Sequence, residues 1–276
     1  MQTKRNIIIF VVIALLCGWL GVIIDHFIPE QPNGNTLGMG IWLILPLLTT
    51  IFLRAFAGDG WRDMGLALNL KGNAKWYLVA FLIYPITTFL LLSFGYLTGW
   101  MDFSNFNFQA ISSAFVSVFF IQFIKNIFEE SVWRGYLTSK LLQFKLNDFW
   151  LYVTVGVVWG AWHIPYFLVF LSDSDIASVL PVNRLVFTII GIVTMIVWTI
   201  MYTEIYLITR SIWPLVLMHA TEDALINPLM LDGYISIAQN KEFFVSPTAG
   251  IVTTLLYLAI GLALRKIRKR YIPSLR

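Results

Sequence analysis

Ten residues decide how this sequence is interpreted: Asn126-Ile127-Phe128-Glu129-Glu130-Ser131-Val132-Trp133-Arg134-Gly135. They follow directly on an almost uncharged apolar run, residues 115–124. In water, two adjacent carboxylates and an arginine would be ordinary. At the end of a helix that crosses a membrane each of these charges is costly, so the cluster indicates a functional site. We therefore predict that this stretch forms half of a buried site whose other half lies on two later helices.

The composition of the whole chain favours a membrane setting. Of 276 residues, 58% are hydrophobic and only 12% are charged, whereas a soluble domain carries about 25% charged residues. The formal net charge is +4. The basic residues lie between apolar runs and near both ends of the sequence, which is typical of a membrane protein and argues against a nucleic-acid-binding one. The single cysteine, Cys17, excludes an intrachain disulfide and a cysteine-based metal site.

Eight apolar segments are long enough to cross a bilayer. They cover residues 7–24, 38–54, 76–98, 110–128, 149–171, 185–208, 212–230 and 248–264. The first lacks a small-residue cleavage pattern, so we expect it to be a retained helix and not a signal peptide.

The basic residues predict the orientation of these segments. With the N-terminus inside, 17 of the 19 lysines and arginines fall on the cytoplasmic side, and only Arg184 and Lys241 fall outside. Positive charge gathers on the cytoplasmic side of membrane proteins. We therefore predict an all-α, polytopic integral membrane protein with eight transmembrane helices and both termini cytoplasmic. Residues 1–276 are expected to form a single membrane-embedded domain with a motif-bearing core at about 110–230.

Helical spacing separates the two glutamates of the first cluster. Glu130 and Arg134 are four residues apart on one helix face, and so are Lys125 and Glu129. The two glutamates point about 100° apart and cannot face the same partner. Taken alone, salt bridges that fix a helix end explain this pattern equally well. If Lys125 pairs with Glu129, it weakens that base and favours Glu130 in its place.

A second cluster lies inside the fifth segment: Trp159-Gly160-Ala161-Trp162-His163-Ile164-Pro165. His163 is about 20 Å from the start of its helix, and Trp159 lies one turn earlier on the same face. Pro165 has no amide hydrogen and is expected to open the helix near His163. Taken alone, a histidine bonded to a neighbouring backbone group is the simpler interpretation.

A third cluster lies in the seventh segment: His219-Ala220-Thr221-Glu222-Asp223. His219 and Asp223 share a helix face at four-residue spacing. One histidine and two carboxylates in one transmembrane segment are costly unless they are paired or functional. Glu204, in the sixth segment, adds another acid, for which a structural partner such as Arg134 or Arg210 is the simpler interpretation.

Across the clusters the ionisable residues form one chemical set of acids and imidazoles: Glu129, Glu130, His163, His219 and Asp223. Such a set suits the activation of water, either directly or through a metal ion. No His-Glu-x-x-His helix is present, which disfavours a zincin-type site. The third histidine, His26, is expected to lie outside the site.

In this order the three clusters resemble the motifs of the CAAX protease and bacteriocin-processing family of intramembrane proteases (CPBP, or ABI), which includes the type II CAAX prenyl endopeptidases. The family pattern is Glu-Glu-x-x-x-Arg, then Phe-x-x-x-His, then His-x-x-x-Asn or Asp. Residues 129–134 match the first motif without a break. Trp159 stands where phenylalanine is usual, and Asp223 is the acidic variant of the third motif. The resemblance covers roughly residues 115–228.

The resemblance implies a membrane endopeptidase with a water-filled site that opens towards the cytoplasmic side. It implies that Glu129 is the general base and that His163 helps to hold and polarise the water. His219 and Asp223 correspond to the pair that stabilises the oxyanion. Arg134 would lock Glu130 and the helix end, with Trp159 in a supporting position.

The motifs do not decide whether the site uses a metal ion. An ionised aspartate cannot donate a hydrogen bond to an oxyanion, whereas asparagine can. Asp223 is therefore suited to orienting His219 or to binding a metal. The resemblance leaves both a glutamate mechanism and a Zn²⁺ site open, the latter with these ligands: Glu129, His163, His219 and Asp223.

The expected partners are the lipid bilayer and a peptide or protein substrate at the membrane, with no nucleic acid. The lack of sorting or retention signals favours the plasma membrane of a prokaryote. Two other function classes stay open: a transporter whose ionisable residues relay protons or ions, and a catalytically silent scaffold or immunity protein. The sequence has no internal repeat or matching pair of broken helices to support a transporter. The intact acids and imidazoles argue against a silent protein.

Overall fold

The computed structural model describes residues 2–32 and 34–271, and it is built from long helices. Within these residues six helical segments are long and apolar enough to cross a membrane. They are α1 (Gln2–Phe27), α2 (Leu37–Ala55), α3 (Ala74–Thr98), the segment Phe108–Phe144 that begins with α4 (Phe108–Val132), the segment Asp148–Phe170 that begins with α6 (Asp148–Trp162), and α8 (Arg184–Thr209). The expected all-α, polytopic membrane architecture is confirmed.

Two further long helices, α9 (Trp213–Leu231) and α11 (Ile251–Tyr271), coincide with the predicted segments 212–230 and 248–264. They are not among the six that meet the length and hydropathy criteria over the described residues. The eight crossings therefore stay a prediction.

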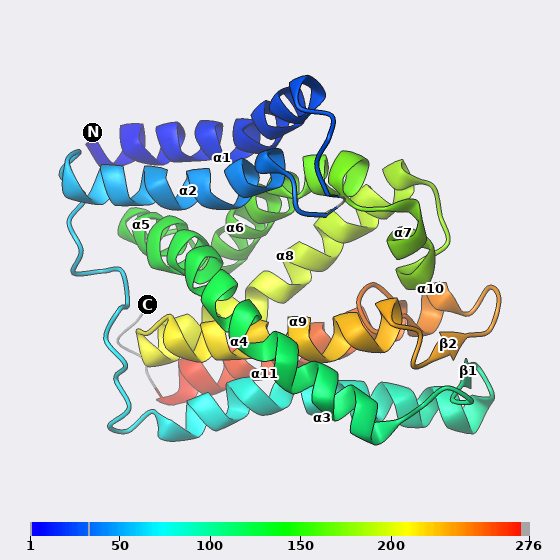
Figure 1. Ribbon diagram of the computed structural model, residues 1–276. Coiled ribbons are helices and arrows are strands. Elements are labelled where there is room, and N and C mark those ends of the chain that lie inside the picture. Colours follow the sequence, from blue (N-terminus) through cyan, green and yellow to red (C-terminus); the bar gives the residue numbers. More distant parts are fainter. Residues whose placement is uncertain (1, 33, 272–276) are drawn as a thin grey trace.

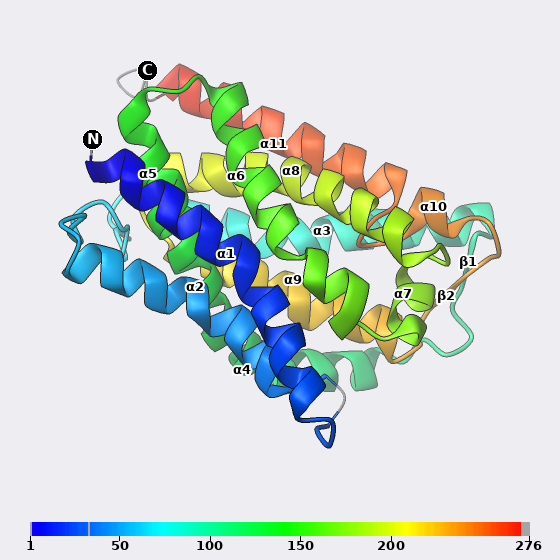
Figure 2. The same cartoon turned by 90° about the horizontal axis from the view of Figure 1, so that it is seen from above.

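The helices pack as a bundle with two distinct ends (Figures 1 and 2). At the end that we call the terminal end, α1 begins and α11 ends. At the opposite end, the loop end, lie α7 (Asp173–Val179), α10 (Glu242–Val245) and a short antiparallel ribbon of β1 (Met101–Asp102) and β2 (Ser236–Ile237). The main helix pairs are α1 with α2, α4 with α9, α6 with α8, and α8 with α11.

The helix that carries the first cluster runs further than predicted. After α4 it continues as a π-helical turn, η1 (Trp133–Thr138), then α5 (Ser139–Leu141) and a 3₁₀ turn, η2 (Leu142–Phe144). Every residue from 129 to 141 is buried. The prediction that Glu129 and Glu130 lie at a helix end is therefore wrong. The helix continues because the charges that follow the glutamates find partners inside the protein.

The helix that carries His163 breaks where Pro165 predicts. Regular α-helix stops at Trp162, and the chain resumes as a π-helical turn, η3 (Tyr166–Phe170). Proline offers no amide hydrogen to the preceding turn, so the α-helical pattern cannot pass through it.

Two predictions about charge need correction. Lys125 and Arg134 were counted as cytoplasmic, but both lie inside the bundle beside the three clusters and carry no information about orientation. Glu204 pairs with neither Arg134 nor Arg210. It binds Arg268 of α11, because α8 packs against α11 at this point. Arg276, also counted as cytoplasmic, lies outside the described residues.

Candidate active site

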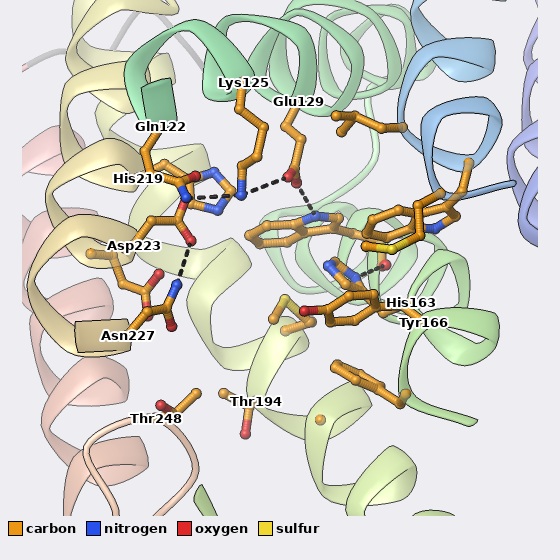
Figure 3. Close-up of a pocket in the computed structure, with 18 of the residues that line it drawn as sticks. Gln122, Lys125, Glu129, His163, Tyr166, Thr194, His219, Asp223, Asn227 and Thr248 are labelled. Carbon is orange, nitrogen blue, oxygen red and sulfur yellow. Dashed lines mark hydrogen bonds and ion pairs between the residues drawn. The ribbon is translucent and has the colours of Figure 1, made fainter. Parts of the chain in front are cut away.

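A cavity of about 500 Å³ lies between α2, α4, α6, α8 and α9 (Figure 3). Its wall brings together ionisable residues from all three sequence clusters, and Lys125 directly before the first: Lys125, Glu129, His163, His219, Glu222 and Asp223. Four of the five predicted catalytic residues thus share one cavity. The fifth, Glu130, lies outside its lining.

Glu129 presents its carboxylate to this cavity, although its side chain is only 5% exposed. The indole nitrogen of Trp159 donates to Oε2 over 3.4 Å, and Nζ of Lys125 lies 3.5 Å from Oε1. The conditional prediction that Lys125 pairs with Glu129 is therefore met. Its corollary, that Glu130 becomes the better base, does not fit the geometry, because Glu130 does not reach the cavity.

Glu130 instead holds two other groups in place from behind the cavity wall. Its Oε1 atom accepts hydrogen bonds from Nη1 of Arg134 at 3.1 Å and from Nδ1 of His219 at 2.9 Å. The guanidinium of Arg134 lies between the ring faces of Trp159 and Tyr202, at 4.1 and 4.3 Å from their centroids. Cation–π contacts of this kind stabilise a buried guanidinium. The predicted pairing of Arg134 with Glu130 is present.

The two cavity histidines are fixed in the same way, by a bond at Nδ1. A carboxylate only accepts, so Nδ1 of His219 carries the hydrogen that Glu130 receives. The carbonyl oxygen of Trp159 likewise accepts from Nδ1 of His163 at 2.9 Å. In the neutral ring this leaves the Nε2 lone pair free. Within the described residues no hydrogen bond reaches Nε2 of either histidine.

Trp159 connects all parts of the site. Its indole binds Glu129, its face covers Arg134, its carbonyl fixes His163, and its ring meets the ring of His219 at a centroid distance of 5.8 Å. A phenylalanine, usual here in the resembling family, would supply the face but not the N–H donor. The tryptophan therefore adds a hydrogen bond to the carboxylate of Glu129.

Asp223 is surrounded by hydrogen-bond donors. Its Oδ2 atom receives Nζ of Lys125 at 2.9 Å and Nδ2 of Asn126 at 2.7 Å, and Oδ1 lies 3.5 Å from Nδ2 of Asn227. The sequence alone does not predict that Lys125 or Asn126 contacts Asp223. Both stand in or beside the first cluster, but only the packing of α4 on α9 brings them to the third.

Glu222 was noted in the sequence as a costly membrane acid but was not assigned to the site. It lines the cavity next to Asp223 and has no basic partner among the described residues. Its position directly before Asp223 was the signal that could have identified it.

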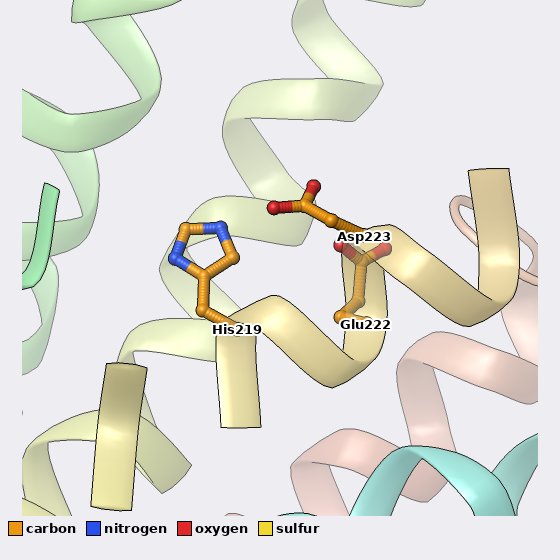
Figure 4. A group of neighbouring side chains, drawn as sticks. All are labelled: His219, Glu222 and Asp223. Atoms are coloured by element: carbon orange, nitrogen blue, oxygen red, sulfur yellow. The ribbon is translucent and has the colours of Figure 1, made fainter. Parts of the chain in front are cut away.

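The metal ligands predicted from the resemblance do not come together as a set. Among residues 2–32 and 34–271, the group whose ligand atoms lie mutually within 4.8 Å is His219, Glu222 and Asp223 (Figure 4). Glu129 and His163 are not part of it. One of its carboxylates, Asp223, is already bound by the ammonium of Lys125. The donor set therefore fits a divalent cation only in part.

The cavity extends from this cluster to the loop end of the bundle. There the exposed loop residue Asn35 lines it, together with the half-buried Thr36 and Thr248. Two expectations therefore conflict: cytoplasmic termini, and a site that opens towards the cytoplasm. The cavity reaches the loop end, whereas the start of α1 and the end of α11 lie at the terminal end.

Comparison with known proteins identifies the part of the chain that carries these residues. Residues 111–225 match the family model described as "Type II CAAX prenyl endopeptidase Rce1-like". A protein of Methanococcus maripaludis named CAAX prenyl protease 2 is 35% identical over 112 residues, which are 38% of this chain and 39% of that relative. The matched span contains all three clusters. The resemblance stated from the motifs is thus confirmed over this span: residues 111–225 are similar to the type II CAAX prenyl endopeptidases of the Rce1-like family.

Proposed function

We propose that this protein is an intramembrane endopeptidase that hydrolyses a peptide bond of a membrane-associated or hydrophobic peptide. One observation carries the proposal. A carboxylate, Glu129, and two imidazoles, His163 and His219, come from three different helices and line one cavity. Both imidazoles are anchored at Nδ1, so their other nitrogens are available to water or substrate.

In the proposed reaction Glu129 is the general base. Its carboxylate takes a proton from a water molecule, and the water oxygen attacks the carbonyl carbon of the peptide. Nε2 of His163 accepts a hydrogen bond from the same water and orients it. When the tetrahedral intermediate collapses, the C–N bond breaks, and the leaving nitrogen takes the proton held by Glu129. Zn²⁺, which the resemblance leaves open as a cofactor, enters no step of this proposal.

Glu130 and Arg134 act in this proposal as positioning residues. Glu130 holds His219 through Nδ1, and Arg134 holds Glu130 while stacking on Trp159. Partners of this kind fix the ring orientation and the tautomer of a functional histidine.

The experiment is peptide cleavage by purified protein in liposomes, with hydrophobic peptides offered both free and prenylated. The expected result is cleavage by the parent and loss of about 10²- to 10⁴-fold in Glu129→Gln and His163→Ala. His26→Ala and Glu242→Gln are matched controls away from the cavity and should cleave like the parent. Equal cleavage by all variants would contradict the assignment. Proton flux across the same liposomes without cleavage would favour a transporter, and neither activity would favour a silent scaffold.

We further propose eight crossings with both termini in the cytoplasm, in the plasma membrane of a prokaryote. The support is the concentration of lysine and arginine at the terminal end of the bundle. The cavity then opens on the outer side, and the substrate enters from there. In a Cys17→Ala background, Asn35→Cys should react with a membrane-impermeant maleimide added to intact cells. Reaction only after lysis would reverse the orientation.

A further inference from the structure

We propose that Lys125 is a catalytic residue of this peptidase, whose ammonium donates a hydrogen bond to the oxyanion of the tetrahedral intermediate. This inference rests on the proposed function and goes beyond the three family motifs, none of which includes position 125. It starts from the place of Lys125 in the cavity. Its Nζ atom lies 3.5 Å from Oε1 of Glu129 and 2.9 Å from Oδ2 of Asp223, between the two carboxylates (Figure 3).

An ammonium in this position has donor capacity to spare. The group carries three N–H bonds and no acceptor. Two of them serve Asp223 and Glu129, and the side chain lines the cavity and is 30% exposed. The third N–H is therefore available to an oxygen that enters the cavity beside the proposed base.

The residues that the resemblance assigns to the oxyanion are poorly equipped for it here. Asp223 is bound by three donor groups, so it is held as an acceptor and has no hydrogen to give. His219 gives its Nδ1 hydrogen to Glu130, and its Nε2 atom donates only when the ring is doubly protonated. An asparagine in place of Asp223 would supply a neutral donor. The lysine beside the aspartate supplies a charged one.

The ammonium of Lys125 supplies the positive charge that a metal ion would otherwise supply. A divalent cation held by His219, Glu222 and Asp223 would share Asp223 with an ammonium only 2.9 Å from that carboxylate. Two cations so close repel each other strongly in a cavity of low dielectric constant. The chain thus carries its own cation at the position where a metal would otherwise neutralise developing charge.

The reaction balances without a further reactant. The water oxygen forms a bond to the carbonyl carbon, its proton goes to Glu129, and the carbonyl π pair moves onto the carbonyl oxygen. Lys125 donates a hydrogen bond to that oxygen and keeps its proton. As the C–N bond breaks, the oxygen regains its double bond and Glu129 returns the proton to the leaving nitrogen.

The test is steady-state cleavage by the parent, Lys125→Met, Asp223→Asn and the double variant, in liposomes. Lys125→Met should lose about 10²- to 10³-fold in kcat with little change in KM, the usual effect of removing one oxyanion donor. The double variant restores a neutral donor at position 223 and should recover at least about tenfold over Lys125→Met. Asp223→Leu also removes the unpaired carboxylate but offers no donor, so Lys125→Met combined with Asp223→Leu should show no such recovery of kcat. Equal recovery in the two double variants would mean that the lysine only neutralises Asp223. Lys71→Met, an exposed lysine far from the site, should cleave like the parent.

Two controls keep the inference falsifiable. Tyr166→Phe removes a different hydrogen-bond donor, a hydroxyl, from the cavity wall and should lower kcat less than about fivefold. A larger loss of kcat than in Lys125→Met would overturn the role of Lys125. Zn²⁺ binding, measured by calorimetry without any substrate, should be tighter in Lys125→Met than in the parent. Equal or weaker binding in the variant would overturn the competition with metal. No cleavage by the parent would refute the proposed function itself, whereas cleavage with unchanged kcat in Lys125→Met would refute only this inference.

Discussion

Two buried polar clusters in this bundle differ in whether any of their hydrogen-bonding atoms are left without a partner. The site cluster comprises Lys125, Glu129, Glu130, Arg134, His163, His219 and Asp223. The second, which we call the α8–α11 cluster, comprises Asp148, Tyr152, Glu204 and Arg268. In the second, Arg268 binds both oxygens of Glu204, through Nε at 2.5 Å and Nη2 at 2.8 Å, and the hydroxyl of Tyr152 adds a third bond.

Burial does not separate the two clusters, because Glu130 and Glu204 are both completely inaccessible. The two clusters differ in whether hydrogen-bonding atoms remain free and face the cavity. None of the residues of the α8–α11 cluster lines the cavity described above, and both oxygens of its glutamate are occupied. The site cluster faces a cavity with two free imidazole nitrogens. A buried charge in a membrane protein therefore marks a catalytic site only when it has capacity left to bind something else.

The largest effect is expected on stability, from breaking the α8–α11 cluster. Arg268→Met leaves Glu204 buried without its main partner, which costs about 3–5 kcal/mol. The midpoint temperature of thermal unfolding in detergent should fall by roughly 10 °C, while kcat at low temperature stays at the parent value. The double variant Arg268→Met with Glu204→Leu should recover most of the loss. A drop in kcat that persists in the stable double variant would mean that this cluster serves catalysis.

The next largest effect is expected on turnover, from Glu130→Gln. The amide oxygen can still accept from both Arg134 and His219, but it carries no negative charge, so both hydrogen bonds weaken and the imidazole is held less firmly. We expect kcat to fall about 10- to 100-fold, the range for partners that orient a functional histidine, with KM nearly unchanged. Glu204→Gln is the matched control and should change stability but not kcat. Equal effects of both substitutions on kcat would erase the distinction between the clusters.

The sequence predicted what is local along the chain. Most apolar segments of sufficient length gave helices within a few residues of their observed bounds, although the last one runs on to Tyr271. The pairs at four-residue spacing, Lys125 with Glu129 and Glu130 with Arg134, are both present. Spacing within one helix determines such pairs. The convergence of three motifs on one cavity followed from the resemblance and not from spacing.

Contacts between helices could not be predicted in the same way. Glu204 binds an arginine 64 positions later, and Lys125 binds an aspartate 98 positions later. Both pairs depend on which helices are neighbours, and hydrophobic periodicity does not reveal that. For the same reason the sequence placed the end of α4 too early, since it could not show that Arg134 and Lys140 find partners inside the protein.

A smaller effect on stability is expected from a third group of charges, the ion pairs of Asp63, which is partly exposed to water. Asp63, between α2 and α3, binds Nη1 of Arg54 at 2.7 Å and Nζ of Lys140 at 2.8 Å. Burial alone would raise the pKa of Asp63, but these two cations outweigh it and hold the pKa below its usual range. A lowered folded-state pKa stabilises the fold above the unfolded value of about 4, and the contribution is lost as pH falls through the folded value.

Asp63→Asn should therefore lower stability by about 1 kcal/mol near pH 7, since the pair is partly screened by solvent. The difference from the parent should shrink below about pH 4. The measurement is thermal unfolding across pH 3–8, with the exposed Asp232→Asn as the matched control that shows no such trend. If the stability difference between Asp63→Asn and the parent were constant with pH, Asp63 would stabilise the fold through packing and not through its charge.

The smallest effect is expected from Trp159→Phe, which separates the packing of the site from its hydrogen bonding. The phenyl ring keeps a face over Arg134 and a contact with His219, but it removes the N–H that donates to Glu129 over 3.4 Å. A bond of that length contributes at most about 1 kcal/mol, so kcat should fall only about three- to fivefold. Trp159→Leu removes the aromatic face as well and should cost more in both kcat and thermal stability, because the buried guanidinium loses one of its two rings. If Trp159→Phe were as damaging as Trp159→Leu, the indole N–H and not the ring face would hold the site together, and Glu129 would depend on Trp159 more than on Lys125.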